Sequence, residues 1–220
     1  MKIWWVIAFW VLPLALLGQQ NKKGSQSSGS PDEWREKVQF YAGMGLEVIE
    51  IHNRRTGMPY FSAHPMVWSM GFGGNYVFSH SNDYLSLGAN PNINLALGWR
   101  NGLSFLFQAP MFLLGRIGAG CTNFNRQKVG AGVGLGFNYT YYGSPYLSAS
   151  GAPARMSLNF VAPAACAEVT FRFRSGPLTF RAHANLLPFN DEIVNGFERT
   201  PVRYMNYGFC LLWYFNTLFN

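Results

Sequence analysis

One segment, Val129–Tyr142, constrains the fold more than any other part of the sequence. Its apolar residues Val129, Ala131, Val133, Leu135, Phe137, Tyr139 and Tyr141 occupy every second position and alternate mostly with glycine, asparagine and threonine. In a strand this period of two places all seven on one face. A helix would scatter them around its axis, and each of its four glycines would cost about 1 kcal/mol relative to alanine. The segment is therefore predicted to be a β-strand with one apolar face.

The same alternation recurs in seven other segments, which are Val38–Glu47, Trp68–Phe78, Tyr84–Arg100, Leu103–Leu113, Ala167–Arg174, Leu178–Leu187 and Met205–Phe215. Eight strands is the number that closes a small β-barrel. The count becomes ten if the segments around Phe112–Gly120 or Met156–Ala162 form strands of their own. A bulge or break is expected at Pro91, because proline lacks the N–H that the ladder needs.

The composition predicts that this barrel lies in a membrane. Hydrophobic residues make up 49% of the 220 residues and charged residues only 12%. A transmembrane barrel places apolar residues on its outer face at every second position, so its mean hydropathy stays near zero. The polar face carries too few charges for the surface of a soluble barrel. The fold class expected is therefore all-β, an antiparallel transmembrane barrel of about eight strands.

The chain is expected to have three parts. Lys2 followed by the apolar stretch Ile3–Leu17 predicts a signal peptide over residues 1–18. Residues 19–33 read as a flexible polar tail in the periplasm, and residues 34–220 as the barrel. With both termini in the periplasm, the long connections near His52–Pro65, Gly143–Pro153 and Pro188–Pro201 face outside. The connection Gly118–Lys128 is longer than a periplasmic turn should be.

The leader, the eight alternating segments and the aromatic last strand resemble the small outer-membrane β-barrel proteins of Bacteroidota-type bacteria. The resemblance spans about Trp34–Asn220 and implies the outer membrane of a Gram-negative bacterium. Barrels of this kind usually end in an aromatic residue, whereas here Phe219 is followed by Asn220.

The inward face is predicted to carry a network of charged residues in the lumen, formed by Glu47, Glu168, Arg172, Arg174, Arg181 and His183. Neighbouring strands are expected to bring Arg172 close to Arg181. Such a network either lines a narrow pore for small solutes or fills the interior as a plug. Side chains normally fill an eight-stranded barrel, which favours the plug.

One segment could carry chemistry. His80, Ser81 and Asp83 resemble the catalytic residues of lipid A deacylase barrels, but those enzymes carry His-x-Ser-Asn and here His80 and Ser81 are adjacent. The expected topology also places this segment in a periplasmic turn, away from the outer leaflet. No metal site is expected, since His52 and His64 have no nearby carboxylate or cysteine and the three cysteines form no close pair. No cofactor motif is found.

The sequence thus favours a non-enzymatic outer-membrane barrel with a structural or interaction role, which the resemblance extends to a subunit of a secretion or assembly complex. A narrow pore and a lipid A-modifying hydrolase are the alternatives. The formal net charge of +7 predicts lipopolysaccharide phosphates among the partners rather than nucleic acid, beside outer-membrane lipid and other outer-membrane proteins.

Overall fold

The computed structural model describes residues 37–58, 66–81, 84–98, 103–123, 125–147, 153–174, 176–195 and 198–215. Residues 1–36, which include the predicted signal peptide and tail, lie outside them. Nine strands form in these ranges, namely β1 Val38–Asn53, β2 Met66–Ser81, β3 Leu85–Gly98, β4 Ser104–Gly118, β5 Val129–Leu147, β6 Pro153–Phe173, β7 Gly176–Asn185, β8 Phe189–Asn195 and β9 Glu198–Tyr214. In the same ranges no helix is long and apolar enough to cross a membrane.

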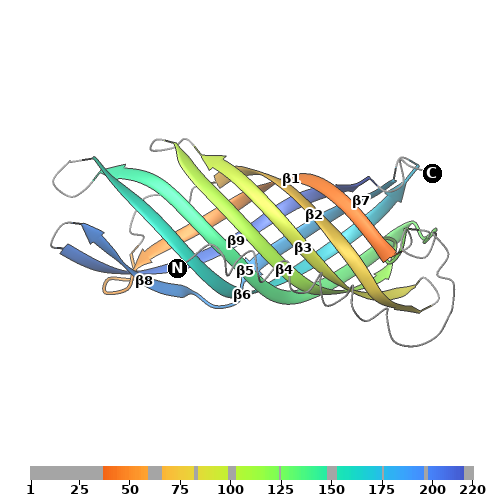
Figure 1. The fold of residues 1–220 in the computed structure, drawn as a ribbon. Coiled ribbons are helices and arrows are strands. Elements are labelled where there is room, and N and C mark those ends of the chain that lie inside the picture. Colours follow the sequence, from red (N-terminus) through yellow and green to blue (C-terminus); the bar gives the residue numbers. More distant parts are fainter. Residues whose placement is uncertain are drawn as a thin grey trace, which may run out of the picture. The chain divides into compact units, whose positions relative to one another are not determined.

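The strands form one antiparallel sheet that closes on itself. Their order is β1-β2-β3-β4-β5-β6-β7-β9-β8, and β1 pairs with β9 to complete the ring. Eight strands therefore make the barrel, and β8 pairs only with the beginning of β9. Figure 1 shows the strands crossing the barrel obliquely, with the β5–β6 and β8–β9 hairpins reaching far out at one end. The all-β antiparallel barrel expected from the sequence is confirmed.

Each of the eight predicted segments overlaps one strand of the ring, and six of these strands are longer than the alternation indicated, the exceptions being β3 and β7. The segment around Phe112–Gly120 continues β4, and Met156–Ala162 belongs to β6, so neither adds a strand. The ninth strand, β8, lies within the predicted connection Pro188–Pro201. Pro91 faces Met111 of β4 without a register shift, so no bulge forms on that side. On the side of β2 the pairing is interrupted at Asn90 and Pro91, which agrees with the expected break. A shift occurs on β2, between Val77 and Ser79.

The two faces of the barrel wall differ sharply. Large apolar side chains are exposed around the whole ring, among them Phe72, Leu95, Leu113, Leu135, Val161, Phe180 and Phe209. Aromatic residues gather toward both ends of this outer face, with Trp68, Phe105, Tyr141 and Tyr207 near one end and Phe40, Phe78, Phe173 and Trp213 near the other. An apolar band between aromatic girdles is the outer surface that a bilayer requires of a barrel.

The strands rise well beyond such a band. At about 3.3 Å per residue and a tilt of about 45°, a strand as long as β6 rises about 50 Å, against an apolar band of about 25 Å. β6 has 21 residues and β5 has 19. Their far ends, together with the β8–β9 hairpin, lie at the end of the barrel opposite to the beginning of β1 and the end of β9. We call this end the loop end, and the opposite one the terminal end.

Candidate functional site

The lumen is the place where polar side chains converge. Charged and amide side chains from nearly every strand of the ring are buried there, including Gln39, Glu47, Asn90, Gln108, Arg116, Asn138, Glu168, Arg181, His183 and Asn206. In a strand whose alternate residues face lipid, these polar residues occupy the other parity and point inward. The lumen falls into successive layers from the terminal end to the loop end.

The layer toward the terminal end is built on a carboxylate between two guanidinium groups. Arg116 Nε donates to Glu168 Oε1, and Arg181 donates to Glu168 Oε2 through Nε at 3.1 Å and NH2 at 2.9 Å. The side chains of Glu168, Arg116 and Arg181 are at most 2% exposed. Burying an ion costs several kcal/mol unless partners compensate it. Here the two arginines compensate the carboxylate, and the cluster spans β4, β6 and β7.

Neutral groups accept further hydrogen bonds from both arginines. Arg116 NH1 donates to Gln39 Oε1 at 2.9 Å and to the Gly120 carbonyl at 3.2 Å, and its NH2 donates to the Tyr214 hydroxyl. Arg181 NH1 lies 3.4 Å from the Tyr41 hydroxyl. Hydrogen-bonded in this way, the cluster holds both arginines in fixed positions across the lumen.

A second ion pair lies on the inner face of the barrel wall and bridges one strand. His183 Nε2 is 3.2 Å from Glu47 Oε2, and both side chains are at most 3% exposed. Glu47 comes from β1 and His183 from β7, so the pair spans β9, which lies between them. Gly208 of β9 pairs with both residues in register.

A belt of amides follows toward the loop end. Gln108 Nε2 donates to Asn206 Oδ1 at 2.8 Å across the lumen, and Asn94 Nδ2 donates to Gln108 Oε1 at 3.5 Å. Asn138 Nδ2 lies 3.5 Å from Asn185 Oδ1. Side chains in this layer thus bond one another across the interior.

The loop end of the lumen is closed by an apolar cluster. Its buried members are Ile49, Ile51, Ala96, Leu106, Tyr142, Leu158, Phe160, Ala162, Val202 and Tyr204, with Phe189 packed against them. The rings of Phe160 and Phe189 stack at 4.7 Å between centroids. This stack joins β6 to β8, which are not neighbours in the sheet, at the loop end of the wall beyond the last residue of β7.

The connection between β4 and β5 closes the terminal end. Ala119, Cys121, Thr122 and Asn125 are buried there. Gln39 Nε2 donates to the Gly120 carbonyl at 3.2 Å, and Asn123 Nδ2 donates to the Val38 carbonyl at 2.8 Å. Arg172 donates to the carbonyl oxygens of Asn123 and Asn125. The long Gly118–Lys128 connection is therefore a stopper rather than a simple turn.

The predicted network residues separate into three groups. The structure brings Glu168 and Arg181 together, and it joins Glu47 to His183. Arg172 does not approach Arg181 as expected, because the β6–β7 register places Arg181 opposite Glu168 and Arg172 opposite Pro177. Arg172 binds the stopper instead, and Arg174 is exposed beyond the end of β6.

Sequence reasoning missed Arg116 and Gln39. The predicted fourth strand ended at Leu113, where two leucines in succession interrupt the alternation, and so it excluded Arg116. Arg116 nevertheless has the parity of Gln108, which lies within the predicted strand and is buried in the lumen. Continuing the strand by three residues would have added the second arginine of the cluster.

The residues proposed for lipid A chemistry are not assembled into a site in the described part of the chain. His80 and Ser81 are exposed at the end of β2 and pair with Ser86 and Leu85 of β3. Asp83 lies outside the described residues, as does His64. Among the described residues, no group of three or more His, Cys, Asp or Glu side chains is placed to hold a metal ion.

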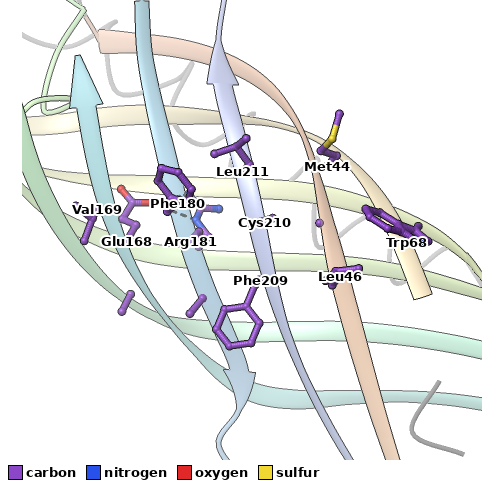
Figure 2. A pocket seen from close by; sticks show the side chains of 13 residues that line it. Met44, Leu46, Trp68, Glu168, Val169, Phe180, Arg181, Phe209, Cys210 and Leu211 are labelled. Carbon is purple, nitrogen blue, oxygen red and sulfur yellow. Dashed lines mark hydrogen bonds and ion pairs between the residues drawn. The ribbon is translucent and has the colours of Figure 1, made fainter. Parts of the chain in front are cut away.

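The outer wall carries a shallow groove of about 510 Å³ beside the charged cluster. Ala167 and Ala182 lie along it, with Phe180, Phe209, Met44 and Trp68 among its larger lining residues. Figure 2 shows Phe180 of β7, Phe209 of β9 and Trp68 of β2 around the groove. It also shows Glu168 and Arg181 joined by their ion pair. Because most lining residues are apolar and at least partly exposed, the groove belongs to the lipid-facing wall.

The outer face and the lumen face of the barrel wall together define the class of protein. A closed antiparallel ring with an apolar, aromatic-girdled exterior and a polar interior is a transmembrane β-barrel of the outer-membrane type. The outer-membrane location expected from the sequence rests on this exterior.

No protein-family model matches the chain, and no curated protein matches it. Solved structures similar to it include the outer membrane protein OprG from Pseudomonas aeruginosa, at 14% identity and a TM-score of 0.46, covering 82% of this chain and 97% of that one. Neisserial surface protein A has 12% identity and a TM-score of 0.43, covering 80% and 97%. The outer membrane protein AlkL, solved in lipid bilayers, has 14% identity and a TM-score of 0.41, covering 88% and 95%. At such low identity these similarities concern the fold alone.

Proposed function

We propose that this protein is a closed outer-membrane barrel that acts through its surface, as a structural or interaction component of the cell envelope. The observation that carries the proposal is the filled lumen. The stopper, the Arg116–Glu168–Arg181 cluster, the amide belt and the apolar cluster follow one another along its length. A barrel filled in this way offers its exterior, rather than a channel, for function.

The working surface is the loop end. β5, β6 and the β8–β9 hairpin extend the barrel wall beyond the apolar band there. Asp191 and Glu192 of β8 are exposed, as is Arg199 of β9. A rigid extension carries these exposed side chains beyond the apolar band, where another protein can reach them. This part would face outside if both termini lie in the periplasm and residues 1–18 direct export, which we also propose.

The narrow pore is less well supported. An anion path would need Arg181 and its neighbours to face an open lumen, whereas Glu168 and the Tyr41 hydroxyl engage the Arg181 guanidinium. The hydrolase is also less well supported, because His80 and Ser81 lie at the terminal end, away from the outer leaflet in the proposed orientation. A His80→Ala variant is expected to leave lipopolysaccharide composition unchanged.

The interaction role is tested by purifying the tagged full-length protein from outer membranes in mild detergent. We expect a stoichiometric protein partner that is retained by the wild type and lost from an Asp191→Lys/Glu192→Lys variant. Arg174→Glu, at the terminal end, serves as the matched control and should retain the partner. A barrel that purifies alone under all conditions would contradict a subunit role.

A further inference from the structure

A second hollow, of about 590 Å³, lies where β1 and β9 leave the apolar band at the loop end. Its lining residues are Glu50, His52, Asn53, Arg54, Gly57, Pro188, Arg203 and Met205. Unlike the apolar groove near Trp68, this hollow is lined mostly by polar and charged side chains. We call it the basic hollow.

At this level the outward-facing residues of β1 and β9 change from apolar and aromatic to mostly charged. Leu46 pairs with Phe209 and Val48 with Tyr207, and the next outward pairs are Glu50 with Met205 and His52 with Arg203. A tyrosine at the border with charged residues above it is the arrangement of a membrane interface. The basic hollow is therefore at headgroup height.

The hollow presents two guanidinium groups. Arg54 and Arg203 are both exposed, and neither forms an ion pair with another described residue. Their backbones are fixed, since the Arg54 N–H donates to the Pro201 carbonyl at 2.9 Å and Arg203 is paired with His52 in the sheet. Arginine offers a planar set of donors that matches the oxygens of a phosphate group.

The carboxylate in the hollow is already engaged. Glu50 Oε1 accepts from the Tyr207 hydroxyl at 2.9 Å, and Glu50 Oε2 lies 3.5 Å from His52 Nε2. These contacts hold Glu50 on the membrane side of His52. Arg203, which pairs with His52, and Arg54, which follows on the chain, lie farther from the apolar band than Glu50.

We propose that the basic hollow binds a phosphate group, that of a phosphorylated glycolipid in the outer leaflet, through Arg54 and Arg203. This proposal rests on the proposed function in one respect, namely that the loop end faces the outside of the cell. The same chemistry would accept free phosphate, and competition distinguishes the two sources.

The test uses the full-length folded protein in zwitterionic detergent, titrated with bis-phosphorylated lipid A and with dephosphorylated lipid A. We expect preference for the phosphorylated form, and a loss of about twenty-five-fold in affinity for Arg54→Gln/Arg203→Gln, because each basic residue near an anionic lipid contributes a factor of about five. Arg199→Gln, which alters an exposed arginine 3.8 Å from Glu192 outside the hollow, should bind like the wild type. Inhibition by millimolar inorganic phosphate would identify phosphate itself as the ligand, and no inhibition would identify the lipid.

Unchanged affinity in the double variant, or an equal loss in Arg199→Gln, would overturn the proposal. Folding of each variant is checked by its heat-dependent shift on gels, and if the double variant does not fold, Arg54→Lys/Arg203→Lys takes its place with a smaller expected loss. The orientation is tested separately with Met58→Cys and a thiol reagent that cannot cross the outer membrane. Labelling of intact cells supports an outward loop end, whereas its absence contradicts the orientation without affecting binding in detergent.

Discussion

Two glycines of the wall stand between the charged residues that pair across them. Gly132 of β5 lies in register between Arg116 and Glu168, and Gly208 of β9 lies between Glu47 and His183. A Cβ at Gly132 would come within 2.9 Å of Glu168 Cγ and 3.0 Å of Arg116 Cγ, and one at Gly208 within 2.4 Å of Glu47 Oε2. The missing side chain lets residues two strands apart bond directly.

Gly132→Ala is therefore expected to lower the free energy of unfolding by about 1 to 3 kcal/mol, the usual cost of overpacking. The measurement is urea unfolding of the refolded protein in detergent. Gly115→Ala is the matched control, because its added Cβ would meet only the Val133 carbonyl at 3.9 Å. Equal stability of Gly132→Ala and Gly115→Ala would show that the pair does not need this space.

Glu168→Gln is expected to be the more damaging change. It leaves the guanidinium groups of Arg116 and Arg181 buried with no opposing carboxylate in the cluster, and breaking a buried ion pair typically costs about 3 to 5 kcal/mol. The exposed pair of Glu192 and Arg199, 3.8 Å apart, provides the control, because exposed pairs contribute about 0 to 1 kcal/mol. Urea unfolding should then separate Glu168→Gln clearly from Glu192→Gln.

At the scale of elements, the connection between β4 and β5 closes the terminal end of the lumen. From the sequence it was recognised only as too long for a periplasmic turn. Arg172 holds it through two backbone carbonyls, and Cys121 within the connection is buried. Removing the guanidinium should free the connection and expose the thiol, while the strands stay paired.

Cys121 itself reports this opening. In a background with Cys166 and Cys210 replaced by serine, Arg172→Ala should make Cys121 react with maleimide several times faster than in the parent. Arg174→Ala removes a nearby exposed arginine and should leave the rate unchanged. If Arg172→Ala also reacts slowly, Arg172 does not hold the stopper in place.

The strands were predictable from sequence where the alternation was strict and were missed where it was not. In β5 the apolar face continues through Tyr141 without interruption, so its start at Val129 matches the prediction. In β6, prolines and alanines over Pro153–Ala165 hide the period, and only the end from Ala167 was predicted. β8 has seven residues and gains its stability from β9 and from the Phe160–Phe189 stack, contacts that no local pattern encodes.

The interior was predictable as a face but not as a set of contacts. Parity alone placed Glu47, Glu168, Arg181 and His183 inward, and all four are buried. Which of them pair depends on the register between strands far apart in the chain, and this register placed Arg181 opposite Glu168 rather than near Arg172.

At the scale of the whole molecule, buried side chains occupy both ends and the middle of the barrel. Its exterior serves the bilayer, and its loop end extends beyond the apolar band. We therefore expect that the lumen does not conduct, because side chains and the stopper fill it from the terminal end to the loop end.

The most direct test is the conductance of the purified full-length protein in planar bilayers, at voltages of both signs and with insertion confirmed by recovery of the folded protein from the membrane. A filled lumen predicts no discrete conductance steps from the wild type, and steps at most from variants that remove the stopper contact or the cluster, such as Arg172→Ala or Glu168→Gln. Stable, uniform conductance steps from the wild type would contradict it and would restore the narrow pore as the leading function.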